Sequence, residues 1–99
     1  ALLLGYYKNN DLIYVGKVGT GFDNYTLYEI NRKLSSIEQK KSSFKEVDIS
    51  TRGIHWVKPN LVAEIKFSKW TSHNKLRHAR FIGLREDKNP KVVFKERPK

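Results

Sequence analysis

The chain opens with two apolar, aromatic runs that one short polar break separates. The runs cover residues 2–8 and 12–18, and the break at 9–11 reads Asn-Asn-Asp. Two β-prone runs around an Asn/Asp turn are typical of an antiparallel hairpin. Gly5 and Gly16 lie inside the runs, where glycine often marks a bulge or a bend. We therefore expect a bulged hairpin at the start of the chain.

The period of the apolar positions then changes. Apolar residues recur at spacings of three, four and three, at Leu27, Ile30, Leu34 and Ile37. This spacing forms one stripe along an α-helix, and the charged positions fall outside it. Thr26 and Glu29 have the spacing of a capping box at a helix N-terminus. The pattern predicts one amphipathic helix over about 26–40 that covers one face or end of a sheet.

After the helix the pattern returns to short strands. A polar connection over 41–53 precedes three β-prone segments at 55–57, 61–67 and 76–84. The alternating positions that we expect to face the interior are Leu61, Ala63, Ile65 and Phe67. The segment 71–75 is a polar turn, and a basic tail begins at residue 89.

Five short strands and one helix in 99 residues predict a mainly β fold, a small five-stranded Greek-key barrel. An SH3-like barrel would share the strands but has less use for a long helix. The length indicates a single domain over residues 1–99. Because the chain starts with Ala1 rather than Met, and directly with a strand, we expect it to be one domain of a longer protein.

The composition narrows the class of protein. A hydrophobic content of 38%, with 12% aromatic residues, is too high for a disordered polycation. Cysteine is absent, which excludes a disulfide scaffold and a cysteine nucleophile and fits an intracellular address. No apolar run approaches the roughly 20 residues that a membrane span needs.

The charge is basic and unevenly distributed. The formal net charge is +10. Residues 1–50 hold seven Lys and Arg against six Asp and Glu, whereas residues 51–99 hold thirteen against four. Such a one-sided field favours a polyanion as partner, either nucleic acid or an anionic membrane surface. A solvated basic face without a partner is the alternative.

Two familiar kinds of site are not predicted. The three histidines, His55, His73 and His78, are scattered and have no Cys or paired carboxylates at metal-ligand spacing. The glycines at 16–21 lack the Gly-Lys-Ser/Thr ending of a phosphate-binding loop. They indicate a flexible turn or, as the alternative, a loop that approaches a nucleic-acid strand closely.

The clearest chemical cluster follows the last β-prone segment. Arg85, Asp87 and Lys88 come within four residues at the end of this segment. Arg can grip two phosphate oxygens at once, and Lys adds a mobile charge, so the pair suits phosphate. A solvated charged turn would have the same composition, and both interpretations stay open on composition alone.

Several motifs resemble one family. The segments 61–71 (LVAEIKFSKWT) and 76–88 (LRHARFIGLREDK) closely resemble the carboxy-terminal domain of ATP-dependent DNA ligases. The resemblance is strongest to the bacterial end-joining type and its archaeal relatives. Residues 2–7 and 14–22 resemble the opening hairpin of that domain, and 55–59 its middle. The resemblance implies an oligonucleotide-binding (OB) fold that follows a nucleotidyltransferase domain, in a prokaryotic, cytoplasmic enzyme associated with the nucleoid.

The resemblance also assigns roles to the charged cluster. Arg85 and Lys88 would contact the β- and γ-phosphates of ATP during self-adenylation and orient the leaving pyrophosphate, and Asp87 would support them. Cations placed where charge develops lower the barrier of such a step. The full-length enzyme would use ATP and Mg²⁺. The adenylating lysine of the family stands in a Lys-x-Asp-Gly motif, and this chain has no Asp-Gly dipeptide, so we do not expect it to ligate alone.

In a later step the domain is expected to close on nicked double-stranded DNA with a different face. The candidate DNA contacts are Lys17, Lys66, Lys69, Lys75, Arg77 and Arg80. We expect about half of them to be ordinary surface charge, because contacts to the phosphate backbone rarely use a whole basic face. Trp70 could stack on a sugar or base, or pack in the core. The isolated domain is expected to be monomeric, with no membrane partner.

Two other classes of function remain as alternatives. A stand-alone single-strand-binding barrel would interleave exposed aromatic and basic residues. The positions expected on the outer face of 61–67 are Val62, Glu64 and Lys66, with no aromatic residue. In a domain for protein contact, Phe44 and Val47 would dock on a partner, but the uneven charge speaks against this interpretation.

Overall fold

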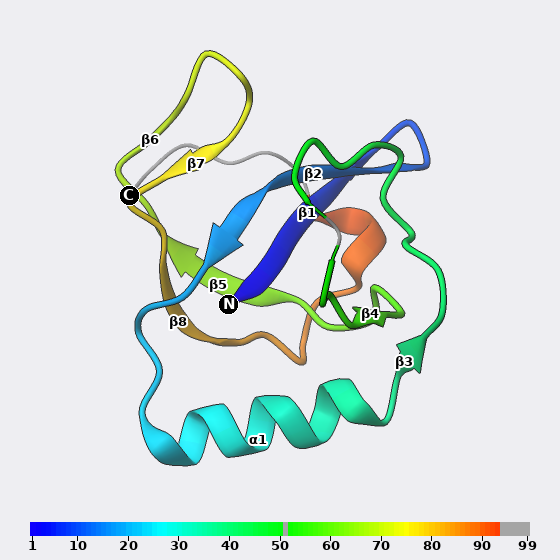
Figure 1. The fold of residues 1–99 in the computed structure, drawn as a ribbon. Coiled ribbons are helices and arrows are strands. Elements are labelled where there is room, and N and C mark those ends of the chain that lie inside the picture. Colours follow the sequence, from blue (N-terminus) through cyan, green and yellow to red (C-terminus); the bar gives the residue numbers. More distant parts are fainter. Residues whose placement is uncertain (51, 94–99) are drawn as a thin grey trace.

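A computed structural model describes residues 1–50 and 52–93 of the chain. It is mainly β with one α-helix, and α1 lies along one side of the strands (Figure 1). The elements in chain order are β1 (Leu2–Lys8), β2 (Asp11–Val18), α1 (Asn24–Ser35), β3 (Glu38–Gln39), β4 (Trp56–Val57), β5 (Ala63–Lys66), β6 (Lys69–Trp70), β7 (Leu76–Arg77), β8 (Arg80–Leu84) and a 3-10 turn, η1 (Pro90–Val92).

The predicted opening hairpin is confirmed as β1 and β2. Asn9 and Asn10 form its two-residue turn with positive φ angles of 53° and 69°, which a type I′ hairpin turn requires. The register shifts after Leu4, which leaves Val15 as an extra residue on β2. Because of this bulge, Tyr14 and Val15 are both buried although they are adjacent.

The helix begins and ends earlier than the predicted range of 26–40. Asp23 is the N-cap residue, and its carboxylate accepts a hydrogen bond from the backbone N–H of Thr26 at 2.7 Å. The predicted capping box of Thr26 and Glu29 is therefore wrong, and Glu29 pairs with Arg32 at 2.8 Å instead. The hydrogen bond from Thr26 also holds the pKa of Asp23 below its ordinary value.

The C-terminal end of α1 is capped by Ser36, whose hydroxyl donates to the carbonyl oxygen of Lys33 at 2.7 Å. The next residues leave the helix because Ile37 accepts a backbone hydrogen bond at 2.8 Å from the segment after β4. Within the predicted apolar stripe, Ile30 is buried whereas Leu27 is exposed. Only part of the stripe therefore contacts the core.

The second half of the chain forms two separate ladders, in which β5 pairs with β8 and β6 pairs with β7. The expectation of one continuous strand over 76–84 is wrong. His78 has a φ of 58°, in the left-handed region, so the chain changes direction between β7 and β8. The hairpin that carries β6 and β7 consequently projects beyond the β5–β8 ladder (Figure 1).

A second bulge sets the faces of β8. Glu64 pairs with Gly83 and Ile65 with Phe81, so Ile82 is the extra residue and is exposed. As a result Phe81, which is 2% exposed, and Leu84 both contact the core. A strictly alternating strand would have placed Leu84 on the same face as the exposed Ile82.

The alternation predicted for 61–67 is confirmed only in part. Ala63 and Ile65 pack against the core, as expected. Leu61 is exposed because it lies ahead of β5, outside the ladder. Phe67 is half-buried and packs edge-on against Trp70, away from the central cluster.

The core centres on Val18, Ile30 and Phe81, which come from β2, α1 and β8. Phe22 stacks on the Phe81 ring with a centroid distance of 4.7 Å. Gly21 approaches the same strand so closely that a Cβ would lie 2.2 Å from the Phe81 carbonyl oxygen, and its φ is +96°. Only glycine fits this crossing, which joins the first half of the chain to β8.

The described strands form four antiparallel pairs and no continuous five-stranded sheet. In the connection after β3, Phe44 makes an isolated bridge with Leu12 and packs edge-on against Tyr14 and Trp56. This side chain therefore packs within the chain itself. The predicted basic tail begins with η1, and its residues 94–99 lie outside the described part.

Candidate functional site

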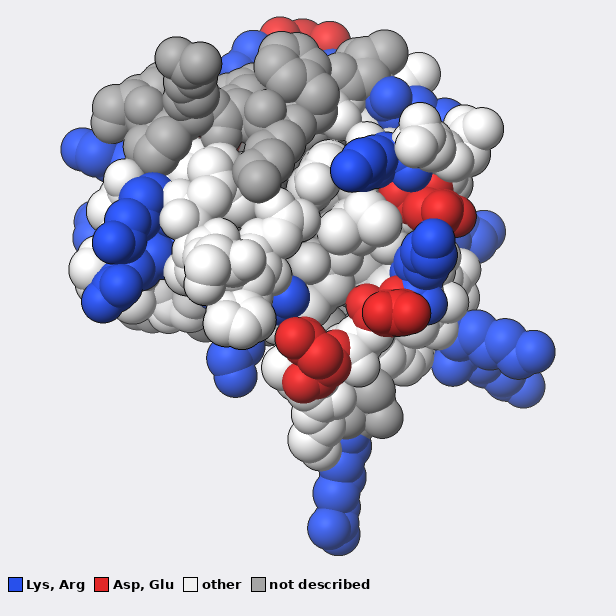
Figure 2. Space-filling model, turned by 90° about the horizontal axis from the view of Figure 1, so that it is seen from above, with Lys and Arg blue, Asp and Glu red and all other residues white. Residues whose placement is uncertain are grey.

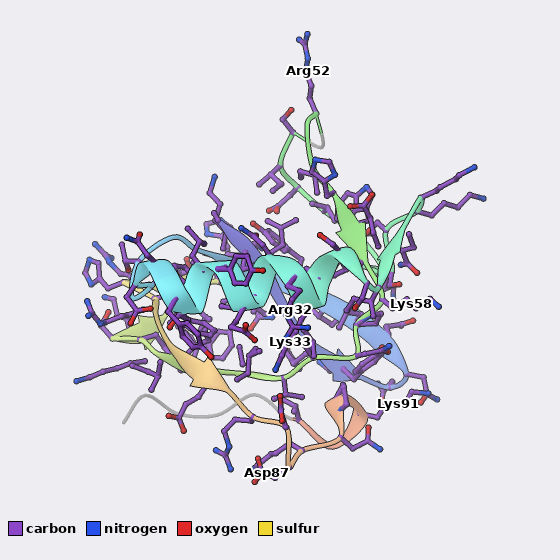
Figure 3. The ribbon with its side chains drawn as sticks, turned by 90° about the horizontal axis from the view of Figure 1, so that it is seen from below. Arg32, Lys33, Arg52, Lys58, Asp87 and Lys91 are labelled. Atoms are coloured by element: carbon purple, nitrogen blue, oxygen red, sulfur yellow. The ribbon has the colours of Figure 1, made fainter. Side chains whose placement is uncertain are left out.

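The charged turn at residues 85–88, here called the 85–88 turn, leaves the end of β8. The backbone N–H of Arg85 donates to the carbonyl oxygen of Val62 at 2.7 Å, so the β5–β8 ladder continues one residue beyond β8. Figure 3 shows Asp87 on one side of α1 and Arg52 on the other. The turn is therefore fixed to the ladder at its first residue.

Two carboxylates hold the guanidinium of Arg85. Its Nε and Nη2 donate to the two carboxylate oxygens of Asp87 at 3.1 and 3.0 Å. Its Nη1 donates to Oε1 of Glu64, on β5, at 3.3 Å. Such charge-assisted, bidentate contacts fix both the position and the plane of a guanidinium.

The protonation states follow from these contacts. Hydrogen bonds from Arg85 hold the pKa of Asp87 below its ordinary value of 3.8. Asp87 in turn raises the already high pKa of Arg85. Both groups are therefore charged at neutral pH, as a fixed guanidinium–carboxylate pair.

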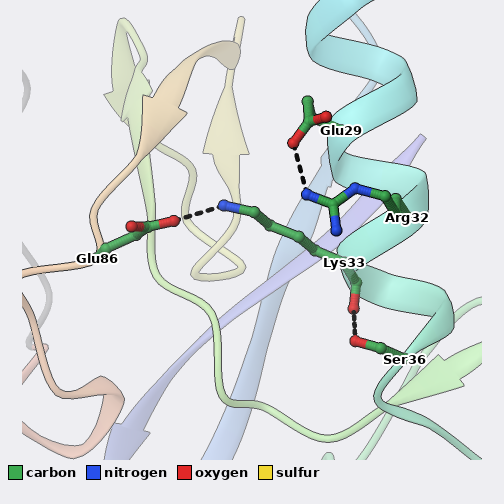
Figure 4. A network of polar contacts seen from close by, with 5 residues as sticks. All are labelled: Glu29, Arg32, Lys33, Ser36 and Glu86. Carbon is green, nitrogen blue, oxygen red and sulfur yellow. Dashed lines mark hydrogen bonds and ion pairs between the residues drawn. The ribbon is translucent and has the colours of Figure 1, made fainter.

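A third contact joins α1 to the 85–88 turn. The Nζ of Lys33 donates to Oε1 of Glu86 at 2.5 Å, and this bond holds the pKa of Glu86 below its ordinary value (Figure 4). The hollow beside this contact, of about 310 Å³, is bordered by Lys33, Arg85 and Lys88. In the described part of the chain, Lys88 has no hydrogen-bonded or ion-paired partner. An anion at this hollow would meet cations from the helix and from both ends of the turn.

Four of the predicted DNA contacts face one another in the two ladders. Lys66 on β5 lies opposite Arg80 on β8, and Lys69 on β6 lies opposite Arg77 on β7. All four are exposed, and within residues 1–50 and 52–93 none of them has an acidic partner. Like charges directly opposite each other destabilise a ladder. We call these four residues the ladder cations.

Lys75 and Lys17 lie in different surroundings. The Nζ of Lys75 contacts a carboxylate oxygen of Asp48 at 3.4 Å and lies 5.5 Å from the centroid of the Tyr14 ring. This half-buried lysine is therefore held within the chain. Lys17 is exposed on β2, opposite Leu3, and belongs to neither ladder of the second half.

On the face drawn in Figure 2, the Lys and Arg side chains of the described residues do not form one continuous patch. They project at several places around the rim, and acidic side chains lie between some of them.

Trp70 packs edge-on against Tyr6 and Phe67, with centroid distances of 6.2 and 5.3 Å. These contacts favour a packing role for this ring.

The described residues contain no group of three or more His, Cys, Asp or Glu that could hold a metal ion. In the same part of the chain, no helix has the length and apolar character needed to cross a membrane.

The sequence analysis did not predict two residues that contact the 85–88 turn, Glu64 on β5 and Lys33 on α1. For Glu64 a signal was present, because a carboxylate on the outer face of a strand that pairs with the arginine-bearing strand can reach that arginine. For Lys33 no local signal existed, since it lies 53 residues from Glu86 in the sequence.

Comparison with known proteins identifies the relatives of this chain. The family model described as "ATP dependent DNA ligase C terminal region" matches residues 1–88. The multifunctional non-homologous end joining DNA repair protein LigD of Mycobacterium tuberculosis is 37% identical over 99 residues. The multifunctional non-homologous end joining protein LigD of Pseudomonas aeruginosa is 36% identical over 103 residues. These matches cover 97% and 99% of this chain, but it spans only 13% and 12% of the two relatives.

Solved structures agree with these relatives. The ligase domain from M. tuberculosis LigD superimposes with a TM-score of 0.83 and 37% identity, over 95% of this chain and 32% of that domain. A mycobacterial DNA ligase D complexed with ATP and MES gives a TM-score of 0.85 and 36% identity over the same shares. The resemblance inferred from the motifs is confirmed, and the chain belongs to the family of C-terminal regions of ATP-dependent DNA ligases.

Proposed function

We propose that this chain is the part of an end-joining DNA ligase that presents Arg85 and Lys88 to the phosphates of ATP during self-adenylation. The observation that carries the proposal is the fixed guanidinium of Arg85 at the end of β8, with Lys88 beside it. A guanidinium held in one plane is suited to bind two phosphate oxygens. Asp87 maintains that plane, and within residues 1–50 and 52–93 no hydrogen-bonded or ion-paired partner occupies Lys88.

The proposed step follows from the chemistry of adenylyl transfer. A lysine amine of the nucleotidyltransferase domain attacks the α-phosphorus of ATP, a P–N bond forms, and the P–O bond to the β-phosphate breaks. The amine loses its proton, and pyrophosphate leaves with the bonding electrons. Arg85 and Lys88 would neutralise the negative charge that grows on this leaving group.

The remaining requirements of this reaction lie outside the 85–88 turn. Mg²⁺, when bound in the full-length enzyme, would offset phosphate charge. We assign Mg²⁺ and the adenosine of ATP to the nucleotidyltransferase domain of the full-length enzyme. The described residues contain no group of three or more His, Cys, Asp or Glu that could hold a metal ion.

The ladder cations have a second role in this proposal, contact with nicked double-stranded DNA. Two pairs of like charges destabilise the ladders unless an anion lies against them. Lys and Arg that meet phosphates hold a duplex without reading its sequence. Lys17 remains a candidate for the same role. Lys75 is the weakest of the six, because Asp48 already holds it.

We also infer that the four ladders are the parts of a five-stranded OB-type Greek-key barrel. The superposition on the mycobacterial ligase domain supports this arrangement.

We further propose that the isolated domain is monomeric and that the full-length enzyme works beside the nucleoid in the bacterial cytoplasm. The bacterial origin of the relatives supports this location.

The test uses the full-length ligase with Arg85→Ala or Lys88→Ala. We expect either variant to slow self-adenylation roughly a hundredfold or more, because the leaving group then lacks one of its cations. Sealing of a nick that already carries the adenylate should fall much less. Lys40→Ala removes an exposed lysine from another part of the surface and is the control. Equal losses in both steps would contradict the proposal and make Arg85 and Lys88 DNA contacts.

A further inference from the structure

The guanidinium of Arg85 has five N–H donors, and the structure accounts for three of them. Asp87 accepts from Nε and Nη2, and Glu64 accepts from Nη1. One donor therefore remains on each terminal nitrogen, Nη1 and Nη2. The side chain is 37% exposed, so a ligand can reach it.

Glu64 reaches Arg85 because of how β5 and β8 pair. Glu64 lies opposite Gly83, and Arg85 follows two residues later on the same face of the ladder, one position past the end of β8. A Cβ at Gly83 would meet no atom within 4 Å, so this position does not crowd the contact. Glu64 is 41% exposed in its side chain, and its carboxylate contacts Arg85 on the side that Asp87 does not occupy.

The two carboxylates come from different parts of the molecule and restrict different motions. Asp87 lies within the 85–88 turn and moves with it, whereas Glu64 belongs to the ladder. The contact from Glu64 therefore ties the guanidinium to the sheet itself. An arginine side chain otherwise loses rotamer entropy when it is ordered by its ligand. A charged side chain that is already ordered does not lose this freedom when its ligand binds.

We propose that Glu64 is a positioning residue for Arg85, one that leaves a donor on each terminal nitrogen free for phosphate oxygens. This inference rests on the proposed function of the 85–88 turn. The opposite role is also chemically defined, since a carboxylate on Arg85 could compete with phosphate. The two roles predict opposite changes in rate, which makes them easy to separate.

The experiment measures single-turnover self-adenylation of the full-length ligase at several ATP concentrations. Glu64→Ala should lower the maximal rate roughly tenfold, because a small misplacement of a catalytic group has a large effect on rate. Glu64→Gln keeps an acceptor oxygen and should have a smaller effect. In an Arg85→Ala background, neither substitution should lower the rate further, because the two residues act as one unit.

Glu29→Gln is the matched control. It makes the same chemical change and removes the carboxylate partner of Arg32 on the outer surface of α1 (Figure 4). We expect its adenylation rate to equal that of the parent enzyme. Thermal unfolding of all variants identifies any that do not fold, and Glu64→Gln, which keeps the size of the side chain, is the variant designed to retain the fold.

Three results would overturn the positioning role: unchanged rates in both Glu64 variants, faster adenylation in either, or rate reductions that add to that of Arg85→Ala. If Arg85→Ala slows adenylation while the Glu64 variants do not, this inference fails and the proposed function stands. If Arg85→Ala leaves adenylation unchanged, the proposed function fails and the inference fails with it.

Discussion

The cations of the 85–88 turn and the ladder cations differ in the charged residues that surround them. At the 85–88 turn, carboxylates hold Arg85 in one plane, and the pair of Lys33 and Glu86 ties the turn to α1. The ladder cations have no such neighbours among the described residues and face each other in like-charged pairs. The guanidinium at the 85–88 turn is therefore held in one orientation, whereas the contacts of the ladder cations do not orient them.

This difference separates two kinds of recognition. An oriented guanidinium can act at one position on one ligand, where geometry decides the rate of a reaction. Unpaired cations on an exposed ladder attract any polyanion, and their effect depends on ionic strength. The chain therefore carries one site suited to chemistry and one surface suited to holding a nucleic acid.

The largest effect is expected from a substitution in β8, which carries Arg80 and leads into the 85–88 turn. Phe81 lies between Arg80 and the 85–88 turn in the sequence and is fully packed in the core. Phe81→Ala should lower the free energy of unfolding by about 3–5 kcal/mol, because it leaves a cavity. Urea unfolding followed by circular dichroism measures this decrease. Ile82→Ala, at the exposed neighbour, should change stability by only about 0.5 kcal/mol. Similar decreases in both variants would contradict the assigned faces of β8.

A smaller effect should separate the two regions by salt dependence. Substituting Lys66 and Arg80 together by Ala removes one like-charged pair. The slope of log affinity for a nicked duplex against log salt should become shallower by about 2, because each cation that neutralises a phosphate adds about one to the slope. Fluorescence anisotropy at several salt concentrations measures the slope.

The matched control for this pair is Lys40→Ala with Lys41→Ala, which removes the same charge from exposed positions after β3. An equal change of slope in the control would mean that net charge, and not the ladder, attracts DNA. The ladder variant should also be more stable by about 0.2–1 kcal/mol, because the repulsion between opposed cations is gone.

The smallest effect concerns pH at the oriented site. Hydrogen bonds from Arg85 hold the pKa of the exposed Asp87 carboxyl below 3.8, so the unfolded chain takes up its proton first as pH falls. The contribution of this pair to stability is therefore present above the ordinary pKa and disappears as pH falls through the lower, folded value. NMR titration of the Asp87 carboxyl measures the shift. In Arg85→Ala the pKa should return toward 3.8, and an unchanged pKa would remove Arg85 as the cause.

Local patterns predicted much of the fold. The turn at Asn9 and Asn10 and the bulge of the opening hairpin depend on residues adjacent in sequence, and both are confirmed. The helix was predicted but its start was misplaced, because Asp23 and not Thr26 is the N-cap residue and accepts the hydrogen bond from the Thr26 backbone N–H. The break at His78 was not predicted, because few non-glycine residues adopt the left-handed region and nothing in the alternating pattern marks this one, although His is among the residue types enriched there.

In the candidate site, too, local contacts could be predicted from the sequence and contacts between distant elements could not. Arg85 and Asp87 are two residues apart, and their pairing is a local property of the turn. The contacts with Glu64 and Lys33 require β5 and α1 to reach the turn from 21 and 53 residues away. Neither the period of the apolar positions nor the charge composition indicates which distant elements come together after folding.

The backbone hydrogen bond from Arg85 to Val62 extends the ladder into the 85–88 turn. Amide hydrogen exchange at Arg85 should consequently follow the opening of the β5–β8 ladder, and not that of a surface loop. The ordering of this residue is then a property of the folded domain before any ligand arrives. Under the proposed function, substitutions in β5 that loosen the ladder should accordingly slow self-adenylation, although their side chains lie outside the 85–88 turn.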